Sequence, residues 1–234
     1  MTSSARFSEI AEIFQGHCMN IKHHPSDAWL LDFACGNLPS LFDQILKAHV
    51  DVCFTCKEAV KDAERLGGEL LDTLGQSSTA TIEMCHEKYD NINNTSDDAS
   101  RAESTGHVAD LEKLVSTYLD SSLNALPWKS FGEGLKLCRL VKEDNVQMWM
   151  LRGQPGVTLP VHSHKGSELT LVMKGAYFCG SQIFQTGDIE EADETVEHQP
   201  VITSGGECIC LAVTEGRLDF KKVLPRIVQT FVGI

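Results

Sequence analysis

The stretch from Gly156 to Gly175 constrains the fold more than any other part of the chain, because glycines bracket polar side chains at fixed spacing. His162 and His164 stand two apart, and Glu168 follows four residues later. On an extended strand the two histidines point to the same side, since side chains alternate between faces. A turn after His164 can return Glu168 to that side. The segment therefore predicts β-structure that gathers imidazole and carboxylate groups at one point.

The apolar pattern after Pro127 also indicates β-structure. Turn residues separate short apolar runs. The runs are LKLCRLV, VQMWMLR, LTLVMKGAYF, CICLAVTE and FKKVL. Several short strands at close spacing are typical of a sandwich or a barrel.

The glycine and ligand spacing resembles the first motif of the cupin family at each position, Gly156-x5-His162-x-His164-x3-Glu168-x6-Gly175. The second cupin motif expects a histidine eleven residues after a glycine, and Gly187 with His198 meets that spacing. The usual Pro, Gly and Asn of that motif are replaced by Asp193, Thr195 and Ile202. The resemblance implies an all-β cupin barrel with four metal ligands, His162, His164, Glu168 and His198. Such a set suits zinc, iron, manganese or nickel.

A second cluster of ligand residues lies near the N-terminus. His49 and Cys53 stand four apart, so on a helix they share a face, and Cys56 follows after a C-x-x-C step. A closed structural zinc site needs four ligands. The nearby candidates for the fourth are His17, Cys18, His23, His24 and Cys35. Spacing alone does not choose among them.

The same region reads as three helices with a small core. The first extends from a Ser26 cap to about Gly36, the second follows through residues 38–52, and the third carries Val60, Leu70 and Leu71. A helical unit of this size is marginally stable without a staple, which a zinc ion can supply.

The order His24, SDAWLLDFACGNLP, then His49-x3-Cys53-x2-Cys56 resembles the zinc-binding anti-sigma domain, in its ChrR branch, over roughly residues 20–75. The resemblance implies zinc held by His24, His49, Cys53 and Cys56, with Cys35 as a core residue. It also implies that the helices, together with segment 109–123, dock on an extracytoplasmic-function sigma factor.

The whole order of segments is similar to that of ChrR-type anti-sigma factors, which implies a regulator that releases its sigma factor under singlet oxygen or organic peroxide. We expect an α+β multidomain chain. Its predicted parts are an extension at 1–20, an anti-sigma domain at 21–85, a linker at 86–108, an amphipathic helix at 109–126 and a cupin domain at 127–234. The linker prediction depends on a polar run that has no periodic hydrophobic residues.

Charge and cysteine content narrow the function. The net charge of −13 disfavours direct binding to nucleic acid. Nine cysteines without a secretory pattern favour reduced thiols and a cytoplasmic location, and no apolar run is long enough to span a membrane.

Alternatives to a non-enzymatic regulator are a metal-dependent cupin enzyme, such as a dioxygenase or isomerase, and a metal-storage or redox-buffer protein. We predict no catalytic residues. Cys208 and Cys210 share one strand face and form a possible redox pair, although such cysteines are more often part of the core.

Overall fold

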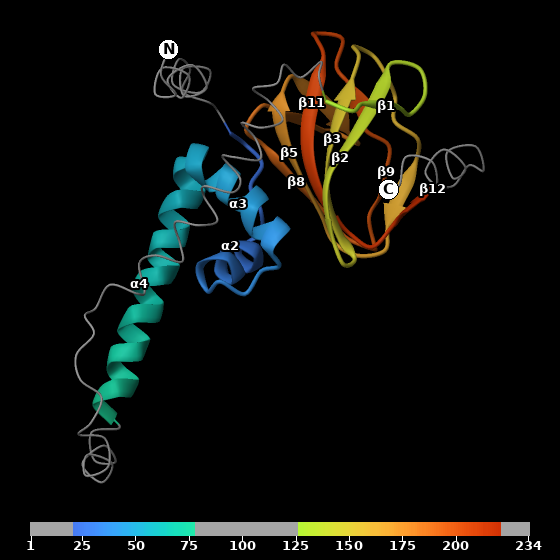
Figure 1. Cartoon of the computed structure of the whole chain (residues 1–234). Helices are drawn as coiled ribbons and strands as arrows, with labels where there is room; N and C mark the ends of the chain where they lie inside the picture. Colours follow the sequence, from blue (N-terminus) through green and yellow to red (C-terminus); the bar gives the residue numbers. More distant parts are fainter. Residues whose placement is uncertain (1–20, 78–125, 221–234) are drawn as a thin grey trace, which may run out of the picture.

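The computed structural model describes residues 21–77 and 126–220, which form a helical unit followed by a β-barrel (Figure 1). The predicted fold class, small helical domain plus cupin barrel, is confirmed. The predicted extension at 1–20, the linker at 86–108 and nearly all of the amphipathic helix at 109–126 lie outside the described residues, as does the chain after 220.

Three helices make up the N-terminal unit, with bounds α2 Asp27–Ala34, α3 Ser40–Val52 and α4 Phe54–Ser77. Ser26 precedes α2 as expected, but its hydroxyl does not cap the helix and instead bonds to Glu191 of the barrel. The helical core is smaller than the sequence indicated, since Val60 is buried but Leu70 and Leu71 are exposed. No described helix is both long enough and apolar enough to cross a lipid bilayer.

Within residues 126–220 the structure describes twelve strands of the barrel, in three antiparallel sheets. The strand orders are β1-β2-β3-β11-β5-β8, β10-β6-β7 and β12-β4-β9. The strand bounds are β1 Lys129–Ser130, β2 Leu135–Glu143, β3 Val146–Gly153, β4 His162–His164, β5 Glu168–Lys174, β6 Ala176–Cys179, β7 Gln182–Gln185, β8 Ile189–Ala192, β9 Glu197–His198, β10 Val201–Ile202, β11 Cys208–Glu215 and β12 Leu218–Phe220.

The last glycine of the first cupin motif has a steric role. Gly175 has a φ of 78°, a conformation that side chains with a Cβ rarely adopt. A Cβ at this position would also lie 2.3 Å from the carbonyl oxygen of Glu207. Only glycine therefore allows the chain to turn from β5 into β6 beside β11.

The largest sheet is buried on both faces. Along β11, Cys208, Cys210 and Ala212 belong to the core inside the barrel. The alternating residues Ile209, Leu211 and Val213 belong to a second core on the outer face. Since one face is not in water, another element has to cover it.

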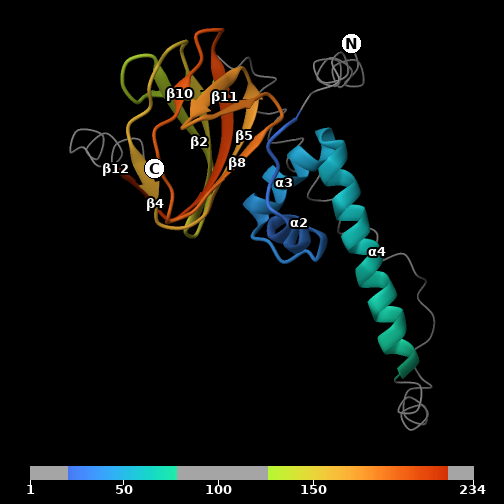
Figure 2. The same ribbon diagram turned by 180° about the vertical axis from the view of Figure 1, so that it is seen from behind.

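Helix α3 covers that outer face. Its buried side chains pack in the same cluster as the outward residues of β3, β5 and β11, and they are Leu41, Phe42, Ile45 and Leu46. Figures 1 and 2 show α2 and α3 beside the barrel, whereas α4 extends away from it. The helical unit and the barrel thus share one hydrophobic core.

Candidate metal centres

The first centre lies where α3 ends and α4 begins. The ligand atoms of His24, His49, Cys53 and Cys56 all lie within 4.8 Å of one another. His24 Nδ1 is 3.3 Å from both sulfur atoms, and His49 Nε2 is 3.3 Å from Cys56 Sγ. Tetrahedral zinc with N and S ligands has ligand–ligand distances of roughly 3.5 Å, so the residues fit this ion.

The chain reaches this geometry through a break between two helices. The sequence pattern suggested that Cys53 is helical. In the structure Cys53 instead ends α3 in an extended conformation, with φ −101° and ψ 107°. The break lets Cys56, in the first turn of α4, return towards His49. In one continuous helix, His49 and Cys56 would lie two turns apart along the helix axis, too far apart to bind one ion.

The other candidates for a fourth ligand lie elsewhere. Cys35 is exposed at the end of α2, so its expected place in the core is wrong. His23 bonds through Nε2 to the Ile183 carbonyl oxygen and packs against the Phe184 ring. His17 and Cys18 lie outside the described residues.

His49 is held as a neutral ligand. It is fully buried, and burial lowers its pKa to about 4, against a smaller raising effect of its bond to Gly187. Its Nδ1 donates to the Gly187 carbonyl oxygen at 2.9 Å, which leaves the lone pair on Nε2 facing the thiols. Neutral imidazole is the form that binds a metal.

The second centre lies inside the barrel. His162 and His164 come from β4, Glu168 begins β5 and His198 ends β9, and all four are buried. Their ligand atoms lie within 4.8 Å of one another. The antiparallel pairing of β4 with β9 sets His162 directly opposite His198. The structure therefore brings together the full set that the cupin resemblance implied.

The facing imidazoles form a site for a cation, either a metal ion or a shared proton. His162 Nδ1 donates to the Pro160 carbonyl oxygen at 2.9 Å, and His198 Nδ1 donates to Glu190 Oε1 at 3.0 Å. Both Nε2 atoms then carry lone pairs, yet they lie only 3.0 Å apart. Two lone pairs at this distance repel each other unless a cation lies between them. Among the described residues, Glu168 Oε2 is also buried without a hydrogen-bond partner.

Local electrostatics support the same interpretation. Burial, followed by the neighbouring His198, lowers the pKa of His162 to about 4. Burial raises the pKa of Glu168, but the contact of its Oε1 with His164 Nε2 at 3.5 Å outweighs this effect and the net shift is downward. Burial lowers the pKa of His164, but the same contact raises it overall, so these two groups form an ion pair when no metal is bound. A divalent metal would replace the proton of His164. A neutral imidazole and an ionised carboxylate are the forms that ligate a divalent metal.

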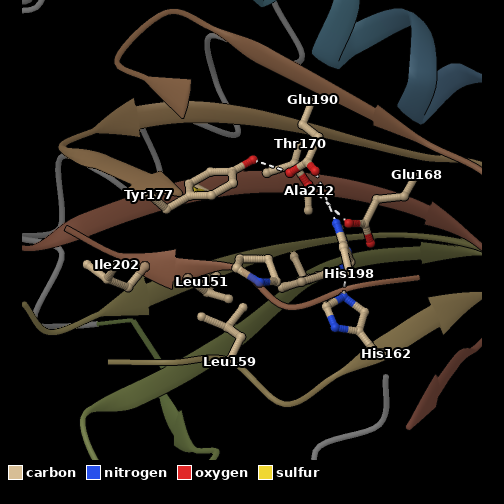
Figure 3. A pocket seen from close by; sticks show the side chains of 13 residues that line it. Leu151, Leu159, His162, Glu168, Thr170, Tyr177, Glu190, His198, Ile202 and Ala212 are labelled. Carbon is tan, nitrogen blue, oxygen red and sulfur yellow. Dashed lines mark hydrogen bonds and ion pairs between the residues drawn. The ribbon is translucent and has the colours of Figure 1, made fainter. Parts of the chain in front are cut away.

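Glu190 and Tyr177 extend this centre, and sequence reasoning assigned neither of them to it. Figure 3 shows the Tyr177 hydroxyl, the Glu190 carboxylate, His198 and His162 in one hydrogen-bonded series. Carboxylates commonly orient metal-binding histidines in this way. Glu190 stands in the acidic run DIEEADE, which reads as a solvated segment, and only the strand alternation of β8 turns it inward.

The altered second cupin motif still forms its turn. Asp193 Oδ1 accepts bonds from the backbone N–H and the hydroxyl of Thr195, an Asx-type turn that takes the place of the usual Pro and Gly. Ile202, in place of the usual Asn, is buried in the barrel core. The loop thus keeps its shape with different chemistry.

Two thiols near the barrel centre, those of Cys179 and Cys210, are not activated. Cys208 and Cys210 are buried with their sulfur atoms 3.6 Å apart. The hydrogen bond with Cys208 and burial together raise the pKa of Cys210 well above its usual value. Burial, then Glu190, raises the pKa of Cys179 to about 12. Thiols of this kind are poor nucleophiles, since the thiolate is the reactive form.

A small cavity lies beside the barrel centre. It has a volume of about 40 Å³, and its walls include Trp149, Leu151 and Ala212 as well as His162 and Glu168. Sites for organic ligands usually measure roughly 300–1,000 Å³. The cavity has room for a few water molecules.

The fold and the two centres define a class: a cupin barrel joined to a helical unit that carries its own closed set of four ligands. Residues 120–218 match the family model described as the ChrR cupin-like domain. The chain is 31% identical over 218 residues to the anti-sigma-E factor ChrR of Cereibacter sphaeroides, covering 92% of this chain and 100% of that protein.

A solved structure of Rhodobacter sphaeroides SigE in complex with the anti-sigma ChrR is also similar. The TM-score is 0.62 at 28% identity, and the match covers 84% of this chain and 100% of that chain. The chain belongs to the ChrR family of anti-sigma factors.

Proposed function

We propose that this protein sequesters an extracytoplasmic-function sigma factor in the cytoplasm through its zinc-bound helical unit. The similarity to ChrR supports this function most, because it extends over both domains and over the whole length of that relative. In the similar solved structure, ChrR is in complex with SigE. The zinc, held by His24, His49, Cys53 and Cys56, would fasten the helices that bind the partner.

Helix α4 offers a docking surface of suitable chemistry. Four exposed leucines follow one side of its outer half, and they are Leu66, Leu70, Leu71 and Leu74. Ion pairs occupy the opposite side, where Arg65 bonds to Asp62 and Glu69. Among the described residues, none covers this side of α4, and an exposed apolar helix side is typical of groove-binding interfaces. We therefore assign the leucine side of α4 to the sigma factor.

Replacing Leu70 with aspartate is expected to weaken sigma binding about 30-fold or more, since loss of a central apolar anchor costs about 2 kcal/mol or more. Calorimetric titration of the purified chain with its sigma factor measures this. Lys61→Gln is the matched control, because it changes the charge equally on the opposite side of α4. Equal binding by Leu70→Asp and the wild type would contradict the assignment of α4.

The barrel centre is the proposed sensor. A metal held by His162, His164, Glu168 and His198 would supply redox or Lewis-acid chemistry for sensing singlet oxygen or an organic peroxide. The cavity of about 40 Å³ has room for a molecule the size of oxygen but not for most organic molecules. This volume favours singlet oxygen over an organic peroxide as the signal at the centre, and sensing over an enzyme reaction such as a dioxygenase or isomerase. The signal has to favour the released state energetically, because otherwise it would not shift the equilibrium.

The double substitution His162→Ala/Glu168→Ala is expected to reduce oxidant-dependent induction of a sigma-controlled reporter to near its basal level, while basal repression persists. Lys165→Ala serves as the control, since this exposed residue lies between the ligands but outside the ligand set. Full induction in the double variant would remove the sensor role from the barrel centre.

A further inference from the structure

One short segment, residues 187–190, contacts ligands of both centres. It comprises the turn after β7 and the start of β8, the strand at one edge of the largest sheet. Along β8, Ile189 packs in the outer core with α3, whereas Glu190 lines the cavity inside the barrel. One side of β8 therefore faces the helical unit, and the other side faces the barrel centre.

On the helical side, the segment bonds to His49 of the first centre and to the backbone just before His24. The Gly187 carbonyl oxygen accepts the Nδ1 bond of His49 at 2.9 Å. The Asp188 carboxylate is fully buried and accepts bonds from the backbone N–H groups of Lys22 at 2.7 Å and His23 at 3.2 Å. The next residue is His24, whose ring reaches the thiols.

The free edge of β8 adds a further backbone contact. The N–H of Ile189 donates to the carbonyl oxygen of His23 at 3.2 Å. Asp188 also accepts a bond from the backbone N–H of Gln185 at 2.9 Å, which fixes its own turn. The chain before His24 is thus bound to the sheet edge on successive residues.

On the barrel side, Glu190 holds His198. One of its oxygens accepts the Nδ1–H of His198 at 3.0 Å, and the other accepts the Tyr177 hydroxyl. Glu190 stands two residues after Asp188, which is roughly 7 Å of extended chain. Within that length the backbone has little freedom to move one carboxylate without the other.

We propose that residues 187–190 couple the two metal centres, so that an occupied barrel centre tightens metal binding at His24, His49, Cys53 and Cys56. A metal bound by His198 would fix the position of its imidazole. The hydrogen bond from that imidazole to Glu190 would then fix the position of β8. The fixed strand then presents Gly187 and Asp188 in the positions that pre-organise His49 and His24. Asp188 and Glu190 act as positioning residues. The proposal deepens the proposed function, since it gives a route from the sensor to the sigma-binding unit.

Coupling of this kind is reciprocal and is measured as a change in affinity. The probe is Co²⁺ added to the full-length metal-free chain without a sigma factor. The readout is the thiolate-to-cobalt charge-transfer band, which a Cys53→Ser variant assigns to the first centre. Sigma factor is absent, so a negative result here is distinct from a failure of sigma binding.

The double substitution His162→Ala/Glu168→Ala disables the barrel centre, and we expect it to weaken cobalt binding at the first centre about tenfold, within the roughly 5- to 150-fold range of coupled sites. Adding Asp188→Asn or Glu190→Gln to each background is expected to abolish that difference, as in a double-mutant cycle. Two separate variants keep the test informative if one of them fails to fold.

Glu191→Gln is the matched control. Glu191 is on the same strand and bonds to Ser26 of the helical unit, but it contacts no ligand. The coupling is expected to persist in this variant. Equal cobalt affinity with and without the barrel ligands would overturn the proposal. Equal loss of coupling in Glu191→Gln and in Asp188→Asn would also overturn the proposal. The coupling would then depend on any contact between the barrel and the helical unit, and not on residues 187–190 through their ligand contacts.

Discussion

Replacing Cys53 with serine is expected to abolish sigma binding, because the helical unit would lose the zinc ion that we propose holds it together. Cys53 and Cys56 are buried together with His49, and few other apolar side chains stabilise this end of α4. In small zinc-binding domains the metal contributes about 10–16 kcal/mol, which is comparable to the whole stability of a typical fold. Loss of one of four ligands removes a large part of that free energy.

The measurement combines calorimetric titration with the sigma factor, zinc content and helical circular dichroism. Cys35→Ser is the matched control, since Cys35 is an exposed thiol outside the ligand group. It is expected to bind sigma and zinc as the wild type does. A Cys53→Ser chain that binds sigma without zinc would show that the ion is not the staple.

Truncating Phe42 to alanine is expected to lower the free energy of unfolding of the helical unit by about 3–5 kcal/mol. Phe42 is 2% exposed and lies in the core that α3 shares with the barrel. Its ring also contacts Trp29, with the ring centroids 5.0 Å apart. The substitution leaves a cavity between the two domains, so α3 is expected to separate from the sheet more readily.

Denaturant unfolding and hydrogen exchange of the α3 amides measure this effect. Phe54→Ala removes the same side chain from an exposed position, where Phe54 is 77% exposed, and is expected to change stability by less than about 0.5 kcal/mol. Similar losses from both variants would mean that the shared core contributes little.

The sequence predicted the elements and the ligands better than it predicted their packing. Leu41, Ile45 and His49 lie on one face of α3 as the periodicity indicated, and all three are buried. What they pack against was not predicted. The sequences of β3 and β11 did indicate that something covers the outer face of the sheet. Both strands are largely apolar at odd and at even positions, and a strand of this kind has both faces out of water.

The misplaced residues have local causes. Cys35 was expected in the core, but it follows α2 at the surface beside Gly36, which turns the chain with a φ of 66°. Leu70 and Leu71 were expected to support a helical core, but α4 leaves its neighbours after its first turns (Figure 2). Sequence periodicity gives the apolar side of a helix, and it does not say whether the partner is in the same chain.

By itself, the sequence determined the order of the two domains and, through spacing at strand and helix periods, which of His49, Cys53, Cys56, His162, His164 and Glu168 can converge. The fourth ligands, His24 and His198, came from the family resemblance. Only the tertiary structure decided that α3 completes the barrel's outer core and that the segment with Gly187 and Glu190 contacts a ligand of each centre. The contacts between this segment and the helical unit join residues more than 130 positions apart, such as His49 and Gly187, which are separated by 138. Local spacing carries no information at that range, because the final packing of whole elements sets which surfaces meet.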